Sequence, residues 1–297
     1  MYDVVIIGGG PAGLSAALAF GRARRKVLLL DAGEPRNAKA REVHNFHTRD
    51  GTPPREMRRL AHEELARYPS VERRIEWVKR LEPHADRVTV HIGCDSVDAR
   101  RVLLATGMID VLPDLPGYRE LWGEAIFQCP YCHGWEVQDL PWGVFAANEH
   151  MFEFALVLRA WTSDLVVFTN GLVPSPEARA KLVAAGIGIE ERTITGVRAG
   201  EPDAHGATLA AVLVEGGEVP RRVIFARPPQ QQSALVRDLG LELDEMGFVK
   251  IDAMYAQTSV PRIHAAGDLT TMAQGAVVSA AAGTMAAARM NHSLMTE

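Results

Sequence analysis

The first 31 residues constrain the fold of this chain more than any other segment. An apolar run at residues 4–7 leads directly into the turn Gly8-Gly9-Gly10-Pro11-Ala12-Gly13. A helix-forming stretch at 14–20 follows, and a second apolar run at 27–30 ends at Asp31. A buried strand, a glycine turn, a helix and a second buried strand make up a βαβ unit. We therefore expect an α/β fold built on a Rossmann-like parallel sheet.

The glycine turn has the spacing of a dinucleotide-binding site. Gly8 permits the tight turn, Gly10 lets a pyrophosphate approach the backbone, and Gly13 lets the helix pack closely on the strand. Asp31, eighteen residues after Gly13, can accept a hydrogen bond from a ribose hydroxyl. The start of the helix would offer backbone amides and a positive dipole end to the phosphates.

Two of the three cysteines lie in the motif Cys129-Pro130-Tyr131-Cys132. Their spacing lets one sulfur form a disulfide with the other. The third, Cys94, is isolated, so the four ligands of a structural zinc site are missing and we expect no metal. Pro130, with His133 and Gly134 after the pair, indicates a turn entering a helix, whose N-terminus favours a thiolate. We interpret the pair as a working dithiol; the alternative is a chance pair of core cysteines.

Composition narrows the class of protein. With 297 residues, 47% of them hydrophobic, the chain can bury two cores of ordinary size. A formal charge of −5 and a pI near 6.1 give no electrostatic case for binding nucleic acid. No apolar stretch approaches the length that spans a bilayer, and the apolar N-terminal run carries Asp3 and reads as a core strand. We expect a cytoplasmic protein that binds neither nucleic acid nor membrane, where a cysteine pair cycles more readily than it cross-links.

Three segments together resemble the FAD signatures of the two-domain flavoprotein disulfide reductases. They are the glycine turn, Ala105-Thr106-Gly107 after an apolar run, and Ala266-Gly267-Asp268 after a short strand. The resemblance implies that FAD is the cofactor, that Asp268 holds its ribityl chain, and that the amides at 274–276 face the pyrimidine edge of the flavin. Asn45 matches a position that contacts the flavin ring, although a plain turn asparagine is the alternative. The implied FAD-binding residues are Gly8, Gly10, Pro11, Ala12, Gly13, Asp31, Asn45, Ala105, Thr106, Gly107, Gly267, Asp268, Gln274, Gly275 and Ala276.

The cysteine motif falls within an insert between the FAD signatures. Linkers at 111–117 and 245–249 predict an FAD-binding domain made of residues 1–117 and 243–297, around a redox domain at 118–242. This arrangement resembles the low-molecular-weight thioredoxin reductases over essentially the whole chain. The fold it implies is a discontinuous Rossmann-like FAD-binding domain with an inserted, degenerate nucleotide-binding-like domain that carries the cysteine pair.

The insert departs from that family where a second glycine fingerprint should bind NADPH. After the apolar run at 142–145 the chain reads Ala146-Ala147-Asn148-Glu149-His150-Met151. Asn148 adds a side chain where phosphate must approach, Glu149 adds negative charge, and Met151 replaces a small residue needed for close helix packing. The segment 169–172 also lacks the arginines that the family places near a 2′-phosphate. We expect NADPH to be excluded; a divergent NADH site is the alternative.

The histidine after the second cysteine indicates a subgroup of these flavoproteins. Cys-Pro-Tyr-Cys-His is unlike the motif of thioredoxin reductases and is similar to that of the dithiol oxidases that close disulfides in gliotoxin-type and holomycin-type natural products. This resemblance implies FAD, a homodimer and dioxygen as the final acceptor. A small-molecule or protein dithiol would attack Cys129, Cys132 would lie nearest the flavin, and His133 would carry the thiol protons.

Other interpretations remain open from the sequence. His133 could face solvent at a helix start, and Glu136 could orient it or be an exposed helix acid. The enzyme could instead take electrons from ferredoxin or NADH and reduce a protein disulfide. A flavin-containing redox sensor without turnover is the third possibility, and the intact cysteine pair beside a histidine counts against it.

Overall fold

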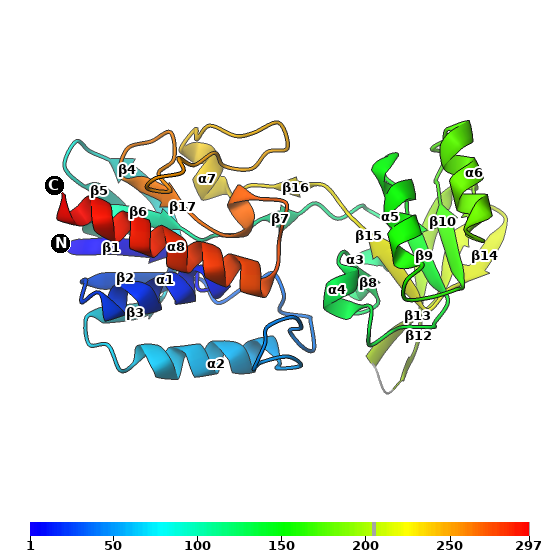
Figure 1. Ribbon diagram of the computed structural model, residues 1–297, viewed down its shortest axis with the longest axis horizontal. Helices are drawn as coiled ribbons and strands as arrows, with labels where there is room; N and C mark the ends of the chain where they lie inside the picture. Colours follow the sequence, from blue (N-terminus) through cyan, green and yellow to red (C-terminus); the bar gives the residue numbers. More distant parts are fainter. Residues whose placement is uncertain (204–205, 297) are drawn as a thin grey trace. The chain divides into compact units, whose positions relative to one another are not determined.

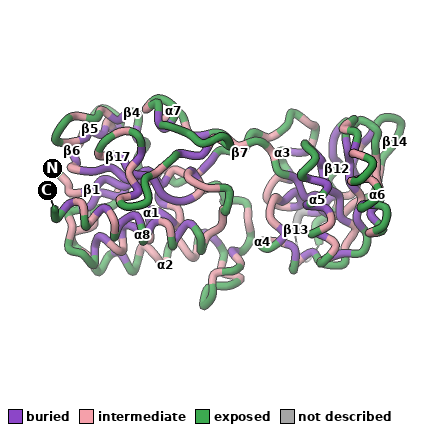
Figure 2. Tube along the Cα trace, turned by 45° about the horizontal axis from the view of Figure 1, so that its top comes forward, coloured by how far each residue is buried: buried purple, intermediate pink, exposed green. Residues whose placement is uncertain are grey.

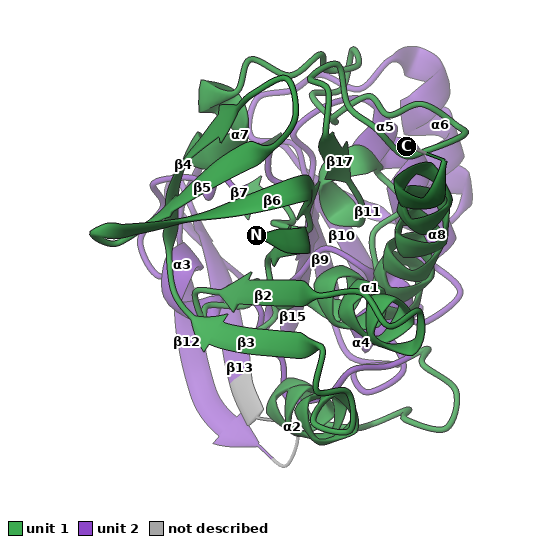
Figure 3. Cartoon of the chain, turned by 90° about the vertical axis from the view of Figure 1, so that its left-hand side faces the viewer, with its two compact units in different colours: residues 1–38, 45–109, 230–297 green, residues 39–44, 110–229 purple. Residues whose placement is uncertain are grey.

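The computed structural model describes residues 1–203 and 206–296 and divides the chain into two compact units. Unit 1 comprises residues 1–38, 45–109 and 230–297, and unit 2 comprises 39–44 and 110–229 (Figure 3). The sequence prediction placed the boundaries near 117 and 242. The segment after 110 clusters with unit 2 because its backbone bonds there: Val111 N donates to Pro229 O, and Pro116 O accepts from Val197 N.

Unit 1 is built on a seven-stranded sheet of order β3-β2-β1-β6-β5-β4, with β17 also paired to β6. Strands β1, β2, β3, β6 and β17 run parallel, and β4 and β5 add an antiparallel ribbon. The bounds are β1 Tyr2–Ile7, β2 Val27–Asp31, β3 Val71–Ile75, β4 Val78–Pro83, β5 Val88–Ile92, β6 Asp95–Leu104 and β17 Ile263–Ala265. Alternate residues of β1 enter the cores on opposite sides of the sheet, as a strand covered on both faces requires.

Two helices pack together on one side of this sheet, α1 (Pro11–Arg22) and α8 (Ala276–Met295), as Figure 1 shows. The small residues of α8 permit the close approach: a Cβ on Gly283 would lie 1.9 Å from Ala12 O. The remaining helices of unit 1 are α2 (Pro54–Leu65), α7 (Ala234–Asp238) and a 3-10 turn at Asp268–Thr270. Within the described ranges, no helix combines the length and apolar character needed to cross a bilayer.

Unit 2 contains a five-stranded parallel sheet of order β11-β10-β9-β15-β8 and a three-stranded antiparallel sheet of order β12-β13-β14. The strands are β8 Ile126–Phe127, β9 Trp142–Phe145, β10 Leu165–Phe168, β11 Gly188–Glu190, β12 Ile194–Asp203, β13 Gly206–Val214, β14 Gly217–Pro220 and β15 Val223–Ala226. The helices are α3 Tyr118–Leu121, α4 Pro130–His133, α5 His150–Leu158 and α6 Pro176–Ala184. Short strands β7 (Ile109–Asp110) and β16 (Gln230–Gln231) pair where the chain passes between the units.

Each unit has its own apolar interior, with buried strands at the centre of each (Figure 2). In unit 2, Trp142 and Val144 of β9 face one core and Phe145 faces the other. Two separately covered sheets agree with the prediction of two domains of ordinary size.

Candidate active site

Cys129 and Cys132 lie in unit 2 directly after strand β8 and form a disulfide. Cys129 keeps an extended backbone (φ −126°, ψ 114°), and Pro130 then begins helix α4. One helical turn brings the two Cα atoms to 5.3 Å. The sequence predicted a turn entering a helix. Since α4 has only four residues, its dipole is a weak source of thiolate stabilisation, and a neighbouring base gains importance.

His133 ends α4 and packs against strand β8. Its ring stacks on Phe127 with the centroids 4.2 Å apart and the planes 18° apart, so the imidazole is half-buried and does not face open solvent. Burial, and after it the nearby His44, lowers the pKa of His133 from 6.5 to about 4. The ring is therefore neutral at physiological pH. It can accept a thiol proton in passing, but it cannot retain that proton for long.

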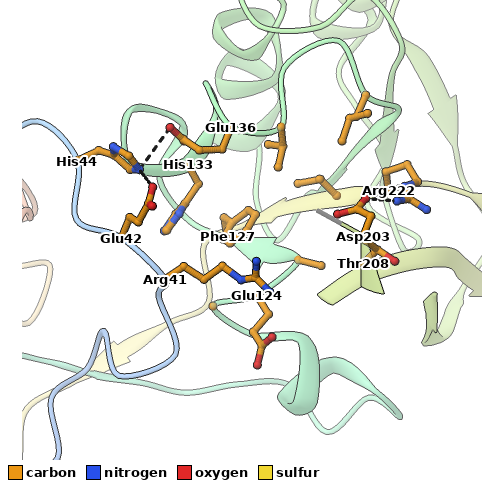
Figure 4. Close-up of a pocket in the computed structure, with 15 residues that line it drawn as sticks. Arg41, Glu42, His44, Glu124, Phe127, His133, Glu136, Asp203, Thr208 and Arg222 are labelled. Carbon is orange, nitrogen blue, oxygen red and sulfur yellow. Dashed lines mark hydrogen bonds and ion pairs between the residues drawn. The ribbon is translucent and has the colours of Figure 1, made fainter. Parts of the chain in front are cut away.

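Glu136 contacts a histidine other than His133. Its Oε1 lies 3.3 Å from Nε2 of His44, which also lies 3.4 Å from Oε2 of Glu42 (Figure 4). Sequence reasoning did not anticipate His44. More than 80 residues separate it from the cysteine motif, so no local spacing signals the contact.

A cavity of about 170 Å³ opens beside these side chains within unit 2. His133 and the His44 cluster form one side of it, and the Asp203–Arg222 ion pair forms another (Figure 4). The lining residues are Arg41, Glu42, His44, Gly123, Glu124, Ala125, Phe127, His133, Glu136, Val137, Leu140, Asp203, Thr208, Arg222 and Val223. Among the predicted catalytic residues, His133 is the one that lines this cavity.

The predicted dinucleotide turn lies in unit 1 between β1 and α1. A Cβ on Gly8 would lie 2.2 Å from Ala105 O, and one on Gly13 would lie 1.8 Å from Gly8 O, so both glycines are required by the fold itself. A Cβ on Gly10 would meet no described atom within 4 Å. Gly10 thus borders open space at the N-terminus of α1, which is where a pyrophosphate would approach.

The second flavin signature leaves a polar atom unsatisfied. Thr106 Oγ1 is buried and has no hydrogen-bond partner among the described residues. Gly107 follows with a positive φ of 64°, and a Cβ there would also meet open space. Ala105, which precedes them, is buried at the end of the sheet. An unpartnered hydroxyl beside an open turn fits a bound polar group such as a nucleotide.

Asp31 has protein partners that the sequence did not indicate. Its carboxylate accepts from Gly9 N at 3.2 Å and pairs with Arg58 Nη2 at 2.6 Å. Arg58 belongs to α2, and this helix directs its side chain to the end of β2. A ribose hydroxyl would therefore share Asp31 with this guanidinium.

The third signature forms a small polar network in unit 1. Asp268 accepts from Ser279 Oγ at 2.6 Å and lies 3.3 Å from Arg36 Nη1. The same arginine donates to Gln274 Oε1 at 2.7 Å. Gly267 has a positive φ of 93°, and Gly275 caps α8 beside open space. Arg36 is thereby joined to two predicted flavin-site residues.

Asn45 lies in a loop of unit 1 with a positive φ of 62°, and its backbone N donates to Asp50 Oδ1 at 2.8 Å. A left-handed backbone at asparagine is the geometry of a turn. Its contact with the flavin ring stays a prediction.

The second nucleotide turn of unit 2 differs from the first. Between β9 and α5, Asn148 and Glu149 are exposed and stand at the helix N-terminus, while Met151 is buried in the core. A thioether thus occupies the place where a small residue would let the helix approach the strand. In addition, the Arg227 guanidinium lies 4.0 Å over the Phe154 ring of α5.

A family model described as "Pyridine nucleotide-disulphide oxidoreductase" matches residues 2–287. The chain belongs to this family. Like other thioredoxin reductase-like members of the family, it is a flavoprotein oxidoreductase of two α/β domains, which confirms the predicted fold and family.

Relatives in this family come from fungi and bacteria. The chain is 33% identical to thioredoxin reductase sirT of Leptosphaeria maculans, over 98% of this chain and 94% of the relative. It is 33% identical to thioredoxin reductase tcpT of Claviceps purpurea, over 90% and 86% of the two chains. The crystal structure of HlmI is 36% identical with a TM-score of 0.91, covering 99% of this chain and 93% of that one. An oxidoreductase from Agrobacterium tumefaciens is 35% identical with a TM-score of 0.90, covering 99% of both chains.

Proposed function

We propose that this flavoprotein is an FAD-dependent dithiol oxidase, which closes a disulfide in a small-molecule or protein dithiol and passes the electrons to dioxygen. The observation that carries the proposal is the altered nucleotide turn of unit 2. There, an exposed carboxylate, Glu149, stands where a pyrophosphate would bind, and Met151 fills the position of the small packing residue. If NADPH cannot bind at this turn, it cannot reduce the enzyme. The electrons would then come from the thiols of the substrate.

The cysteine pair begins the cycle as the disulfide that the structure contains. A substrate thiolate attacks Cys129 Sγ, the Cys129–Cys132 bond breaks, and Cys132 leaves as a thiolate. The second substrate thiolate then attacks the substrate sulfur bonded to Cys129, which releases a substrate disulfide and leaves the cysteine pair reduced by two electrons. His133, neutral and beside the motif, accepts the thiol protons.

FAD, when bound, would accept the two electrons from the cysteine pair. The turn at Gly8, Gly10, Pro11, Ala12 and Gly13 would hold its pyrophosphate, and Asp31 would hold the adenosine ribose. Thr106 offers an unpartnered hydroxyl and Asp268 an accessible carboxylate for the rest of the cofactor. A cytoplasmic homodimer is part of the same proposal and rests on the family resemblance.

Anaerobic titration tests the direction of electron flow. We expect dithiothreitol to bleach the flavin absorbance rapidly and NADPH to bleach it slowly or not at all, followed by dioxygen consumption on turnover with dithiol. A variant with both cysteines changed to serine is the matched control, in which dithiol bleaching should be lost. Fast bleaching by micromolar NADPH, followed by catalytic reduction of thioredoxin, would identify an ordinary reductase instead. Bleaching by NADH or reduced ferredoxin alone would favour a reductase with another donor.

A further inference from the structure

We propose that His44, Glu42 and Glu136 form a proton outlet through which thiol protons accepted by His133 reach solvent. The inference rests on the proposed dithiol oxidation and assigns a role to three residues beyond the cysteine motif. They act through His133, as positioning residues, and we refer to them together as the proton outlet.

The need for an outlet follows from the surroundings of His133. Its ring is stacked on Phe127 and half-buried, and its pKa of about 4 means that the imidazolium is a short-lived state near neutral pH. Each substrate dithiol brings two S–H protons. Because His133 is a weak base, it must transfer the first proton to another group before it can accept the second.

The contacts of His44 suit it to receive that proton. Two carboxylates, from Glu136 and Glu42, lie 3.3 and 3.4 Å from its Nε2, so this ring nitrogen stands next to two groups that can take a proton onward. Side-chain exposure rises along the outlet, from 14% at His44 to 31% at Glu136 and 47% at Glu42. The three side chains thus form a graded path from the buried edge of the cavity to solvent.

The cavity links the two histidines. Both line the same space of about 170 Å³, which has charged side chains in its lining and is large enough for several waters, and His44 is close enough to lower the pKa of His133. The charged groups around His44 are Arg41 and Glu42 from its own segment, His133 and Glu136 from the turn of α4, Glu124 before β8, and the Asp203–Arg222 pair across the cavity. Four carboxylates against two arginines leave this space acidic, which favours the transit of a cation.

The protons and electrons of the proposed reaction balance without a further reactant. The substrate loses two electrons and two protons as its disulfide forms, and the cysteine pair gains the two electrons as the Cys129–Cys132 bond breaks. The two protons pass through His133 and are returned to the cysteine sulfurs or released through the outlet.

The test follows the opening of the disulfide directly, independent of the flavin colour. Dithiothreitol is added anaerobically between pH 6 and 9, the reaction is quenched with iodoacetamide, and alkylation of the peptide that contains both cysteines is measured by mass. His44→Gln keeps polar contacts to the carboxylates but takes up no proton, and His44→Asn is a second variant of the same kind. His150→Gln is the matched control, because His150 is an exposed histidine of the same unit outside the cavity.

We expect His44→Gln to slow disulfide opening about tenfold or more at pH 6–7, less than the roughly 10²-fold expected for His133→Gln. The difference in rate between His44→Gln and wild type should become smaller toward pH 9. At that pH more of the dithiothreitol is already a thiolate, which has no proton to be removed. Added imidazole should restore the rate near pH 6.5, and His150→Gln should match the wild type.

A rate in both His44 variants equal to wild type at pH 6–7 would overturn the outlet. The proposal would also be wrong if the variants opened the disulfide more slowly by the same factor at every pH and imidazole did not restore the rate. That result would mean that His44 only holds the local structure in place. If dithiothreitol fails to open the wild-type disulfide at any pH, the proposed dithiol oxidation itself is wrong, a result distinct from both.

Discussion

At the scale of single residues, His133 shows how packing changes the chemistry of a motif. The sequence places it after Cys132 and predicts a proton carrier with a pKa near neutrality. Burial of the ring, and after it the nearby His44, lower that pKa to about 4, so the residue accepts protons only transiently and does not store them. The residue type and its place in the motif were predictable, whereas its pKa depends on burial and on His44, which only the folded chain brings near.

The low pKa of His133 predicts an acid-labile contribution to stability. Between about pH 6.5 and 4 the unfolded chain binds a proton at this residue that the folded chain does not, so unfolding becomes easier as the pH falls. The full difference between these two pKa values corresponds to about 3 kcal/mol. His133→Gln should therefore lose less unfolding free energy than wild type between pH 7 and 5 in urea titrations. Parallel losses in the two proteins would contradict the buried position.

The two cysteines should differ in a spectroscopic test. If Cys132 lies nearest the flavin, Cys129→Ser leaves a lone thiolate that donates to the flavin and gives a long-wavelength charge-transfer band. Cys132→Ser should show no such band. Absorbance between pH 6 and 9 in both variants measures this, and a band confined to Cys132→Ser would reverse the assigned roles.

At the scale of elements, the turn between β1 and α1 was predictable because its signal is local. Strand, glycines and helix follow one another within a few residues, and the structure contains them in that order. The segment at 39–44 was not predictable in this way. It clusters with unit 2 although its neighbours on both sides in the sequence belong to unit 1, so only long-range contacts reveal it.

Two glycines of the β1–α1 turn should respond in opposite ways to alanine. Gly10→Ala adds a Cβ that meets no described protein atom, so the apoprotein should keep its melting temperature while flavin retention falls. Gly13→Ala places a Cβ 1.8 Å from Gly8 O and should destabilise the fold itself by roughly 1–3 kcal/mol. Thermal unfolding and flavin content of both variants decide this, and normal flavin retention in Gly10→Ala would argue against pyrophosphate at this turn.

At the scale of the whole molecule, the two units have separate sheets and separate cores, and the predicted flavin residues are all in unit 1. The βαβ unit at the start of the chain, the two linkers and the family resemblance were together sufficient to predict two α/β domains. The boundaries were harder, because a proline-rich linker and a segment packed by hydrogen bonds through Pro116 look alike in sequence.

Removing the flavin should therefore affect the units unequally. A ligand that binds only the folded unit 1 stabilises that unit by mass action, so apoprotein should lose amide protection in β1, α1 and β6. Strands β9 and β10 of unit 2 should keep theirs. Hydrogen exchange of the holoprotein and apoprotein, with flavin added back as the control, measures the difference. An equal loss in both units would mean that flavin binding is coupled to the folding of the entire chain.

The segment at 39–44 also has a consequence for exchanging parts between relatives. In the sequence, unit 2 looks like a single insert at residues 110–229 that could be exchanged between this chain and another family member. Moving residues 110–229 of this chain into a relative would leave His44 and Glu42 behind and bring Glu136 into the recipient without its partner. A functional chimera must therefore transplant residues 39–44 along with the insert, because this unit consists of two separate pieces of the sequence.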